Sequence, residues 1–560
     1  MRAQHTTSHN ETWSRAWRVT FMTTSLLAVL GLSPSCAEPE DGADDSTELP
    51  PPYGGFPHDA EPVDWFTDVT DQTGISALHM VRGDDLLFSG NGVAAGDVDG
   101  DGRIDILATR GNGAAALYRN IGKLEFEDVS DASGIDTDFP ARLAALGDMD
   151  ADGDIDIVLA GDEGTRIYYN AGDGRFELGT ATGLDAGPDG QTLLLLDFDN
   201  DGMTDILVAE ARGPGSSSRG HLYRNRGDGT YENVWDALGL PEHGYTWVVT
   251  ASDYDNDGDI DLLFGNDTFI PDTGARPVPG SADDDVVPDL LYRNDGFGAT
   301  GLPTYTEVGG AAGIREYRST MGIIAADFSG DGIVDLYYSD WGRNDLLVGN
   351  GDGTFSDRSA DYDLGYPRRN DAECECLLVS WGSAKADFDL DGNDDLVVVN
   401  SAFPGGDTRQ PAIVWRGTAD AGYVPVQTGL GWLSGRALVP ADLDEDGDLD
   451  LLVTTWEGPL RVFRNDRVSA NGWLRVRLHG TVSNPDGLGA GVTVTLTSGR
   501  TIRRDIGTGG VVHSWAPNEA HFGLGGDSIA SLEVSWPSGN YQRLDAVDPN
   551  REIEIWEPVQ

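Results

Sequence analysis

A nine-residue acidic pattern recurs along the chain and restricts the possible folds more than any other feature. Its first copy, DVDGDGRID, runs from Asp97 to Asp105, with aspartates at positions 1, 3, 5 and 9 and a glycine at position 6. The six later copies begin at Asp148, Asp197, Asp253, Asp327, Asp387 and Asp442. Their starts lie 49 to 74 residues apart. This spacing is typical of a repeat architecture in which each repeat forms one structural unit.

The residues around each acidic loop predict four short β-strands. An apolar strand leads into the loop, and a β-branched strand such as IDIVLAG follows it. A third strand ends in LYRN or a variant, and a fourth opens on an aromatic residue, as in FEDVSDASGI. Four short strands separated by Gly/Asp turns are typical of one blade of a β-propeller. We therefore predict an all-β fold with seven blades.

The first and last repeats complement each other. The seventh repeat stops at Val462–Asn465 and lacks its fourth strand, whereas an extra copy of that strand, WFTDVTDQTGI, stands at Trp65–Ile75, before the first loop. We predict that this N-terminal strand completes the last blade, so that residues 64–465 form a closed ring. Closure removes strand edges that would otherwise pair with other chains.

The net charge excludes some partners and favours others. The 560 residues include 95 acidic and 37 basic ones, and the formal charge is −58. Nucleic-acid backbones and anionic membranes both require clustered Lys and Arg, so neither is an expected partner. Such an excess of carboxylates indicates a cation partner. The three cysteines do not make a disulfide scaffold.

The N-terminal residues predict export. Arginines precede the apolar stretch VTFMTTSLLAVLGL, and SPSC follows it, ending at Cys36. This order is typical of a signal peptide over residues 1–36. Lipid attachment at Cys36, which would give an outer-membrane or cell-surface lipoprotein, and plain secretion both remain open. Residues 37–63 are acidic and Pro-rich and predict a disordered linker. No other apolar run is long enough to form a transmembrane helix.

The repeats resemble the FG-GAP (VCBS) family, whose calcium-loop blades also occur in integrin α-subunit heads. Beyond the repeats, NGWLRVRLHG, HFGLGG and SLEVSWPSG resemble the ASPIC/UnbV domain, which follows such propellers in bacterial proteins and in the cartilage acidic proteins. The resemblance implies an integrin-α-like propeller followed by a small β-rich, sandwich-like domain over residues 466–560. It implies no particular activity.

The acidic loops have the chemistry of calcium sites. Calcium takes six to eight oxygen ligands in flexible geometry, and a glycine at position 6 permits the sharp turn. The absence of Cys and His argues against zinc, and magnesium fits such a loop poorly. The alternative is a set of simple Asp/Gly turns. The predicted ligands, with position 7 acting through its carbonyl, are Asp97, Asp99, Asp101, Arg103, Asp105; Asp148, Asp150, Asp152, Asp154, Asp156; Asp197, Asp199, Asp201, Met203, Asp205; Asp253, Asp255, Asp257, Asp259, Asp261; Asp327, Ser329, Asp331, Ile333, Asp335; Asp387, Asp389, Asp391, Asn393, Asp395; and Asp442, Asp444, Asp446, Asp448, Asp450. Because Ser329 replaces an aspartate, we expect the fifth site to be the weakest.

Four further features have both plain and functional interpretations. The RGD tripeptides at Arg82–Asp84 and Arg226–Asp228 are expected to be turns rather than adhesive motifs. Cys374 and Cys376 form either a local disulfide or two free thiols. The acidic, Pro-rich insert Asn266–Asp289 is either a variable surface loop or a partner-binding loop. The tryptophans near strand ends flanking the loops favour blade packing over a sugar-stacking platform; they are Trp247, Trp341, Trp381 and Trp456.

The sequence contains no motif that identifies an enzyme: G-x-S-x-G, H-E-x-x-H and P-loop patterns are all missing. We therefore expect an exported, monomeric, non-enzymatic calcium-binding propeller that binds a protein or polysaccharide ligand. The alternative is a lyase or hydrolase acting on extracellular polysaccharide.

Overall fold

The computed structural model describes most of residues 62–559. The gaps are residues 76–77, 81–91, 111–112, 162, 181–182, 185–189, 211–219, 242–245, 268–286, 315–317, 366–377, 403–408, 468 and 508–512. The predicted signal peptide with Cys36, the linker, the first RGD, the Cys374/Cys376 pair and most of the insert lie outside the described residues. Within the described part of the chain, no helix is both long and apolar enough to cross a membrane.

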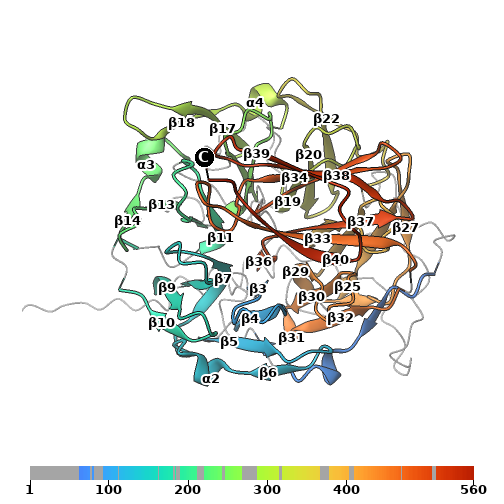
Figure 1. Ribbon diagram of the computed structural model, residues 1–560, viewed down its shortest axis with the longest axis horizontal. Helices are drawn as coiled ribbons and strands as arrows, with labels where there is room; N and C mark the ends of the chain where they lie inside the picture. Colours follow the sequence, from blue (N-terminus) through green and yellow to red (C-terminus); the bar gives the residue numbers. More distant parts are fainter. Residues whose placement is uncertain are drawn as a thin grey trace, which may run out of the picture.

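Seven sheets of four antiparallel repeat strands follow one another around a ring, and this confirms the predicted all-β propeller (Figure 1). From the innermost strand outward, the blades are β3 (Val93–Gly96), β4 (Asp105–Arg110), β5 (Gly113–Asn120) and β6 (Phe126–Asp128); β7 (Ala141–Gly147), β8 (Asp156–Gly161), β9 (Gly164–Asn170) and β10 (Phe176–Leu178); β11 (Gly190–Leu196), β12 (Asp205–Glu210), β13 (His221–Asn225) and β14 (Tyr231–Asn233); β15 (Thr246–Ser252), β16 (Asp261–Asn266), β17 (Leu290–Phe297) and β18 (Pro303–Glu307); β19 (Thr320–Ala326), β20 (Asp335–Asp340), β21 (Asp345–Gly349) and β22 (Phe355–Asp357); β23 (Ser380–Ala386), β24 (Asp395–Asn400), β26 (Ile413–Gly417) and β27 (Tyr423–Val426); and β29 (Gly435–Ala441), β30 (Asp450–Thr455), β32 (Arg461–Asn465) and β1 (Phe66–Asp68).

The ring closes as the repeat pattern predicted. Strand β1 pairs antiparallel with β32, and Phe66 lies opposite Asn465. The Thr70 hydroxyl accepts a hydrogen bond from the Val462 N–H at 3.0 Å, and Asp68 forms an ion pair with Arg461. Each innermost strand also contacts the next one around the ring, and β29 contacts β3. The N-terminal strand therefore supplies the outer edge of the last blade.

The blades are held together by apolar side chains between neighbouring sheets. Strands such as β8, β11 and β15 are buried along their whole length, because each has a blade on either side. This explains why they read as continuous apolar runs rather than as alternating strands. The short peripheral elements are η1 (Thr70–Gln72), α2 (Ser130–Ser133), α3 (Trp235–Leu238) and α4 (Gly309–Ala312), with strand pairs β2 (Leu78–Met80) to β31 (Glu457–Pro459) and β25 (Gln410–Pro411) to β28 (Trp432–Leu433).

The C-terminal residues form two further sheets that lie against the ring (Figure 1, red). One sheet contains β37 (Glu519–Gly525), β33 (Gly472–His479) and β40 (Arg551–Trp556); the other contains β35 (Thr501–Asp505), β34 (Gly491–Leu496), β38 (Ile529–Ser535) and β39 (Tyr541–Asp545). They share one apolar core, which includes Leu474, Val492 and Phe522. The short strand β36 (Ser514–Trp515) leaves this domain and pairs in parallel with β3 at the centre of the ring.

Candidate metal centres and the domain that covers them

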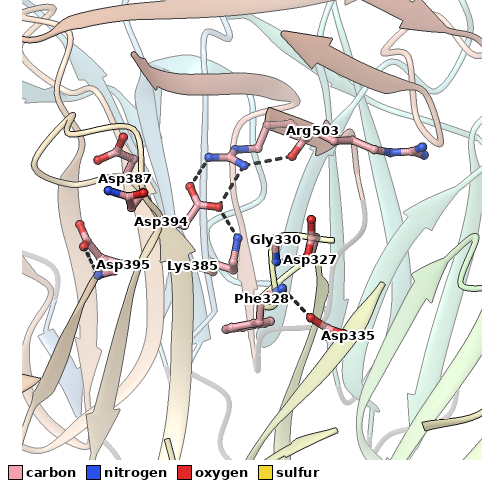
Figure 2. Close-up of polar contacts among 12 residues, drawn as sticks. Asp327, Phe328, Gly330, Asp335, Lys385, Asp387, Asp394, Asp395 and Arg503 are labelled. Carbon is pink, nitrogen blue, oxygen red and sulfur yellow. Dashed lines mark hydrogen bonds and ion pairs between the residues drawn. The ribbon is translucent and has the colours of Figure 1, made fainter. Parts of the chain in front are cut away.

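All seven acidic loops lie on one face of the propeller. Each loop joins the end of an innermost strand to the start of the second strand of the same blade, as between β11 and β12. Since every innermost strand runs in the same direction through the ring, the loops emerge together. We call this side the loop face. Figure 2 shows two neighbouring loops, with Asp327 and Asp335 in the fifth and Asp387 and Asp395 in the sixth.

The loops share one conformation. In the third loop, the Asp197 carboxylate accepts hydrogen bonds from the N–H groups of Asp201 at 3.1 Å and Gly202 at 3.0 Å. Gly202 has φ +87°, which a side chain rarely tolerates, as the turn at position 6 predicted. The residue at position 4 is also left-handed, including the non-glycine residues Ala151 and Leu390. At position 7, the N–H donates to the position 5 carboxylate; these residues are Arg103, Asp154, Met203, Asp259, Ile333, Asn393 and Asp448.

The closing aspartate of each loop is fully buried and ties the blade together. Asp205 accepts a hydrogen bond from Phe198 N–H at 3.2 Å, within its own loop, and another from Asn225 N–H at 2.7 Å, at the end of the third strand. The equivalent aspartates make the same two kinds of bond, and none of them is exposed to solvent; they are Asp105, Asp156, Asp261, Asp335, Asp395 and Asp450. Position 9 therefore shapes the blade as well as facing the acidic cluster.

The loops gather carboxylate oxygens closely enough to share one cation. The groups whose oxygens lie within 4.8 Å of one another include Asp97, Asp99 and Asp101; Asp148, Asp150 and Asp156; Asp197, Asp199 and Asp205; Asp253, Asp255 and Asp261; and Asp387, Asp389 and Asp395. Among described residues, the buried Oδ1 atoms of Asp99, Asp255 and Asp442 have no hydrogen-bond donor. A buried acceptor without a donor is costly, and a hard cation would satisfy it. The donor set fits calcium.

Burial of these like charges raises their pKa values. Desolvation, with the neighbouring aspartates adding to it, raises the pKa of Asp105 to about 7, of Asp156 to about 8 and of Asp261 to about 9. In the seventh loop, burial raises the pKa of Asp448 to about 10. Removing a carboxylate from water disfavours its ionised form unless an opposite charge is close. A bound cation would supply that charge.

In some loops, an arginine already supplies part of the positive charge that a cation would provide. Arg224, on β13, lies 2.6 Å from an Asp199 carboxylate oxygen and 2.9 Å from one of Asp201. Arg467, just after the propeller, lies 3.2 Å from Asp389. The third and sixth loops are therefore partly neutralised without a metal, and a cation bound there would share its ligands with a guanidinium.

The C-terminal domain lies directly on the loop face. Arg475 of β33 reaches the first aspartate of the seventh loop, Asp442, at 3.2 Å. The backbone N–H of Gly525 donates to the Leu390 carbonyl of the sixth loop at 2.9 Å. His521 of β37 hydrogen-bonds with the Gly447 carbonyl at 2.9 Å. The C-terminal domain thus covers much of the sixth and seventh loops, while Glu445 and Asp446 of the seventh stay exposed.

At position 8 of the sixth loop, between the predicted ligands Asn393 and Asp395, Asp394 joins the two domains. It forms ion pairs with Lys385 of β23 and with Arg504 of β35. Figure 2 shows Asp394 and Lys385 beneath the C-terminal strand that carries Arg503. These two cations hold the pKa of the buried Asp394 carboxyl well below its usual value, despite its desolvation.

A cavity of about 620 Å³ remains between the C-terminal domain and the first three loops. Asp148 lines it from the propeller, and Arg477, Asp486 and Glu519 line it from the C-terminal domain. Asp486 accepts a hydrogen bond from the Asp148 N–H at 2.8 Å, and burial raises its pKa to about 7. Arg477 lies 3.7 Å from Asp97. We call this cavity the interdomain cleft.

The second RGD is a turn and the tryptophans pack inside the ring, as expected, but the structure differs from the sequence expectation on where the tryptophans lie. The tryptophans lie at the strand ends opposite the acidic loops, not beside them, because Trp247 begins β15 whereas its loop follows that strand. Trp247, Trp381 and Trp456 are buried against one another, with successive ring centroids 5.8 Å apart, so they do not form an open sugar-stacking platform. The second RGD is the exposed turn after β13, in which Arg226 pairs with Glu232.

The groups that the C-terminal domain brings to the loops could not be predicted from the sequence. Arg475, Arg477 and Asp486 belong to a domain that follows the last repeat, and nothing in their local sequence indicates a loop contact. The asparagine at the end of the third strand is the last residue of the LYRN pattern, and nothing in that pattern indicated its hydrogen bonds. In the fifth loop, the Ser329 side chain offers no carboxylate, and the Ser329 N–H donates to Asp335 at 2.7 Å.

Comparisons with known proteins agree with this architecture. The FG-GAP-like repeat model matches residues 97–159, 148–208 and 197–264, and the ASPIC and UnbV model matches residues 480–560. The chain carries FG-GAP-like repeats and an ASPIC/UnbV domain. It is similar to cartilage acidic protein 1 of Xenopus tropicalis, with 30% identity over 48% of this chain and 42% of that protein, and of Homo sapiens, with 29% identity over 51% and 44%. The chain thus matches less than half the length of these relatives.

Solved structures show only a distant likeness. An Agrocybe aegerita lectin that recognises non-reducing terminal N-acetylglucosamine has 19% identity and a TM-score of 0.39, over 60% of this chain and 80% of that one. A Lactobacillus plantarum protein has 11% identity and a TM-score of 0.37, over 65% and 88%. At these TM-scores the likeness carries no functional information.

Proposed function

We propose that this protein is an exported, calcium-stabilised binding module without enzymatic activity. The observation that carries the proposal is the set of acidic loops, in which buried carboxylates cluster on one face and some of their oxygens have no donor among the described residues. Calcium would neutralise these clusters and complete their oxygen coordination. The aspartates at positions 1, 3, 5 and 9 would hold it, together with the position 7 carbonyl. Extracellular calcium concentrations suit modules of this kind.

The ions would stabilise the fold by a large amount. A ligand present at ten times its dissociation constant stabilises the folded state by about 1.4 kcal/mol per site. Seven such sites would contribute on the order of 10 kcal/mol, which is comparable with the net stability of a whole domain. Because the C-terminal domain rests on the same loops through Arg475, Gly525 and His521, the ions would also strengthen the contact between the two domains.

Thermal unfolding with and without calcium tests this proposal. We expect the melting temperature of the full chain to rise strongly in calcium at about 1 mM, and to fall when EGTA is added. Magnesium at the same concentration should replace calcium poorly. Isothermal titration should detect several sites, and Asp253→Asn, in the more exposed fourth loop, should remove one of them. An unchanged melting temperature in EGTA would contradict the proposal.

We propose the interdomain cleft as the ligand site, and a protein or polysaccharide as the ligand. The cleft is bordered by the first metal loops and by Trp556, which is 54% exposed and stacks on His479 with ring centroids 4.4 Å apart. An exposed aromatic ring beside polar groups is suited to the apolar face of a sugar or to an aromatic side chain. The cleft would then need calcium for its shape.

A glycan and protein-ligand screen in calcium tests the ligand site. Trp556→Ala should weaken retention of the ligand, whereas Tyr541→Ala, at an equally exposed aromatic residue on β39, should not. Product analysis on the same sugars distinguishes a binder from an enzyme. New reducing or unsaturated ends would contradict the non-enzymatic proposal.

A further inference from the structure

The centre of the ring, which is surrounded by the innermost strands and which we call the central channel, contains a buried arginine at the end away from the acidic loops. Arg436 lies near the start of β29, whereas the seventh loop begins at Asp442, after the end of that strand. The Arg436 side chain is fully buried, and its guanidinium lies 4.0 Å from the ring centroid of Trp456 and 4.3 Å from that of Trp381. Trp247 is further away, at 5.9 Å. Two indole rings therefore lie close to the guanidinium, and they supply no acceptor for its N–H donors.

The N–H donors of Arg436 have no partner among the described residues. In the part of the chain that the structure describes, the Nε, Nη1 and Nη2 atoms of Arg436 have no hydrogen-bond partner, and no carboxylate lies within 4.0 Å of them. Burial lowers the pKa of Arg436 to about 9 without any charged neighbour to offset the effect, so the group stays cationic at neutral pH. A buried charge without a counter-charge is strongly unfavourable.

Another buried arginine shows how this chain normally satisfies such a group. Arg318 is equally inaccessible and also lies over an aromatic ring, that of Tyr338 at 4.8 Å. It has two carboxylate partners, however, Asp289 at 3.6 Å and Asp345 at 3.1 Å. Arg436 has the same aromatic contact without the carboxylates. The missing element at Arg436 is thus an acidic group.

Among the described residues, no anionic side chain offsets the charge of Arg436. The Nε1–H of Trp456 has no acceptor among the described residues. His513, which enters the channel from the C-terminal domain, is buried, and the charges of Arg436 and Arg142 help to lower its pKa. Unsatisfied N–H donors beside a cation, with no carboxylate of the described residues to match them, have the polarity of an anion site.

We propose that Arg436 anchors a second ligand site, for a small carboxylate-bearing molecule, at the channel end opposite the loop face. A planar carboxylate matches the edge of a guanidinium through two parallel hydrogen bonds, and the Trp456 Nε1–H offers a third donor. Such a group occurs on a uronic acid and on the free carboxyl end of a peptide. The ligand would enter beside Trp341, a half-buried ring that packs against this tryptophan cluster. The site is independent of the metal loops and of the interdomain cleft.

Titration of the calcium-loaded full chain tests the site. Because Arg436 is fully enclosed, a ligand must displace an indole, so binding should change the tryptophan fluorescence. We expect sodium glucuronate, N-acetylalanine, or both to change the fluorescence and to raise the melting temperature. Glucose and N-acetylalanine amide, which lack the carboxylate, should do neither. The acid that binds identifies the source of the carboxylate, and failure of both acids would overturn the proposal.

Variants locate the site at Arg436. Arg436→Lys keeps the charge but loses the planar edge, so it should weaken binding at least about tenfold. Arg436→Met should abolish binding, and its ligand-free melting temperature should equal or exceed that of the wild type because an unpaired buried charge is removed. Trp456→Phe keeps the ring and removes one donor, and it should weaken binding more mildly. Arg543→Met, at an exposed ion pair on β39, removes the same charge and should bind normally. Unchanged affinity in Arg436→Met would overturn the proposal.

Discussion

The asparagine that ends the third strand connects neighbouring blades. Asn225 donates one side-chain hydrogen bond to the Thr204 carbonyl of its own blade at 3.1 Å and another to the Met149 carbonyl of the preceding blade at 2.8 Å. Asn120, Asn170 and Asn465 make the same pair of bonds. Gly349 and Gly417 stand at this position in the fifth and sixth blades and cannot do so. The bonds therefore join some blades and not others.

Asn225→Ala should destabilise the protein by about 2 kcal/mol, because two buried carbonyls lose their donor. Denaturant unfolding in saturating calcium measures this loss. Asn350→Ala is the control, since Asn350 is exposed and its side chain bonds only within its own turn, to Thr354 and Ser356. It should change the unfolding free energy by less than about 0.5 kcal/mol. Equal effects of the two substitutions would show that Asn225 does not connect the blades.

Two left-handed residues in one loop allow a matched test of backbone strain. Gly153 has φ +96°, and an added Cβ would have open space around it. Gly153→Ala should therefore cost about 1–2 kcal/mol through backbone strain alone. Ala151 has φ +61°, so Ala151→Gly should stabilise slightly, by about 0.5 kcal/mol. Thermal unfolding of both variants in calcium measures the two changes in stability. A melting-temperature shift of the same sign in both variants would contradict the assignment of backbone strain to these positions.

Strand β1 has a larger effect than its length suggests, because it closes the ring. Its Phe66 is buried and meets Phe388 of the sixth blade at 5.7 Å between ring centroids. Phe66→Ala should destabilise the protein by about 3–4 kcal/mol. Loss of β1 would also expose the edge of β32, which invites pairing with other chains.

Urea unfolding and light scattering during heating measure these two effects of Phe66→Ala. Leu178→Ala on β10 provides the control. That side chain is 51% exposed, and it lies on the outermost strand of a blade whose four strands follow one another in the sequence, so it plays no part in closing the ring. The control should neither unfold early nor aggregate. Normal stability of Phe66→Ala would mean that the ring is held by its inner strands alone.

The whole molecule combines a strongly anionic chain with a single face that collects much of the buried negative charge. The folded-state pKa values of Asp105, Asp156 and Asp261, at about 7, 8 and 9, all lie above their ordinary value. Carboxyls with raised pKa values stabilise the metal-free fold at acid pH, and they lose that contribution as the pH rises through the folded pKa values. Calcium requires the ionised carboxylates, so its contribution changes in the opposite direction.

In EGTA, the melting temperature should therefore fall as the pH rises from about 4, the ordinary carboxyl pKa, to about 9, because these carboxyls ionise in the fold without a counter-charge. In calcium at about 1 mM it should fall far less, so that the gap between the two curves widens with pH. Calorimetry in both buffers measures this. Parallel curves would mean that the raised pKa values do not report on the metal loops.

Most of the architecture follows from local patterns in the chain. The recurrence of D-x-D-x-D-G-x-x-D and the strand signals around it predict the seven blades, because each blade depends on residues close together in sequence. Closure was predicted by matching the extra strand at Trp65–Ile75 to the strand that the last repeat lacks. The loop conformation is local in the same sense: the glycine at position 6 and the carboxylates around it are sufficient to predict the turn. The left-handed residue at position 4 was not foreseen, because Ala151 and Leu390 carry no preference for that conformation.

The contacts between the two domains could not be predicted from the local sequence around the residues that form them. Asp486 beside Asp148 and Arg475 beside Asp442 pair residues far apart in the chain, and folding alone brings them together. The same holds for Arg436, whose tryptophan neighbours come from three other strand ends around the channel. A short-range sequence pattern predicts the local backbone conformation, because the residues that form it are neighbours in the chain. Burial and charge pairing instead depend on which surfaces meet when the ring closes and the C-terminal domain covers it.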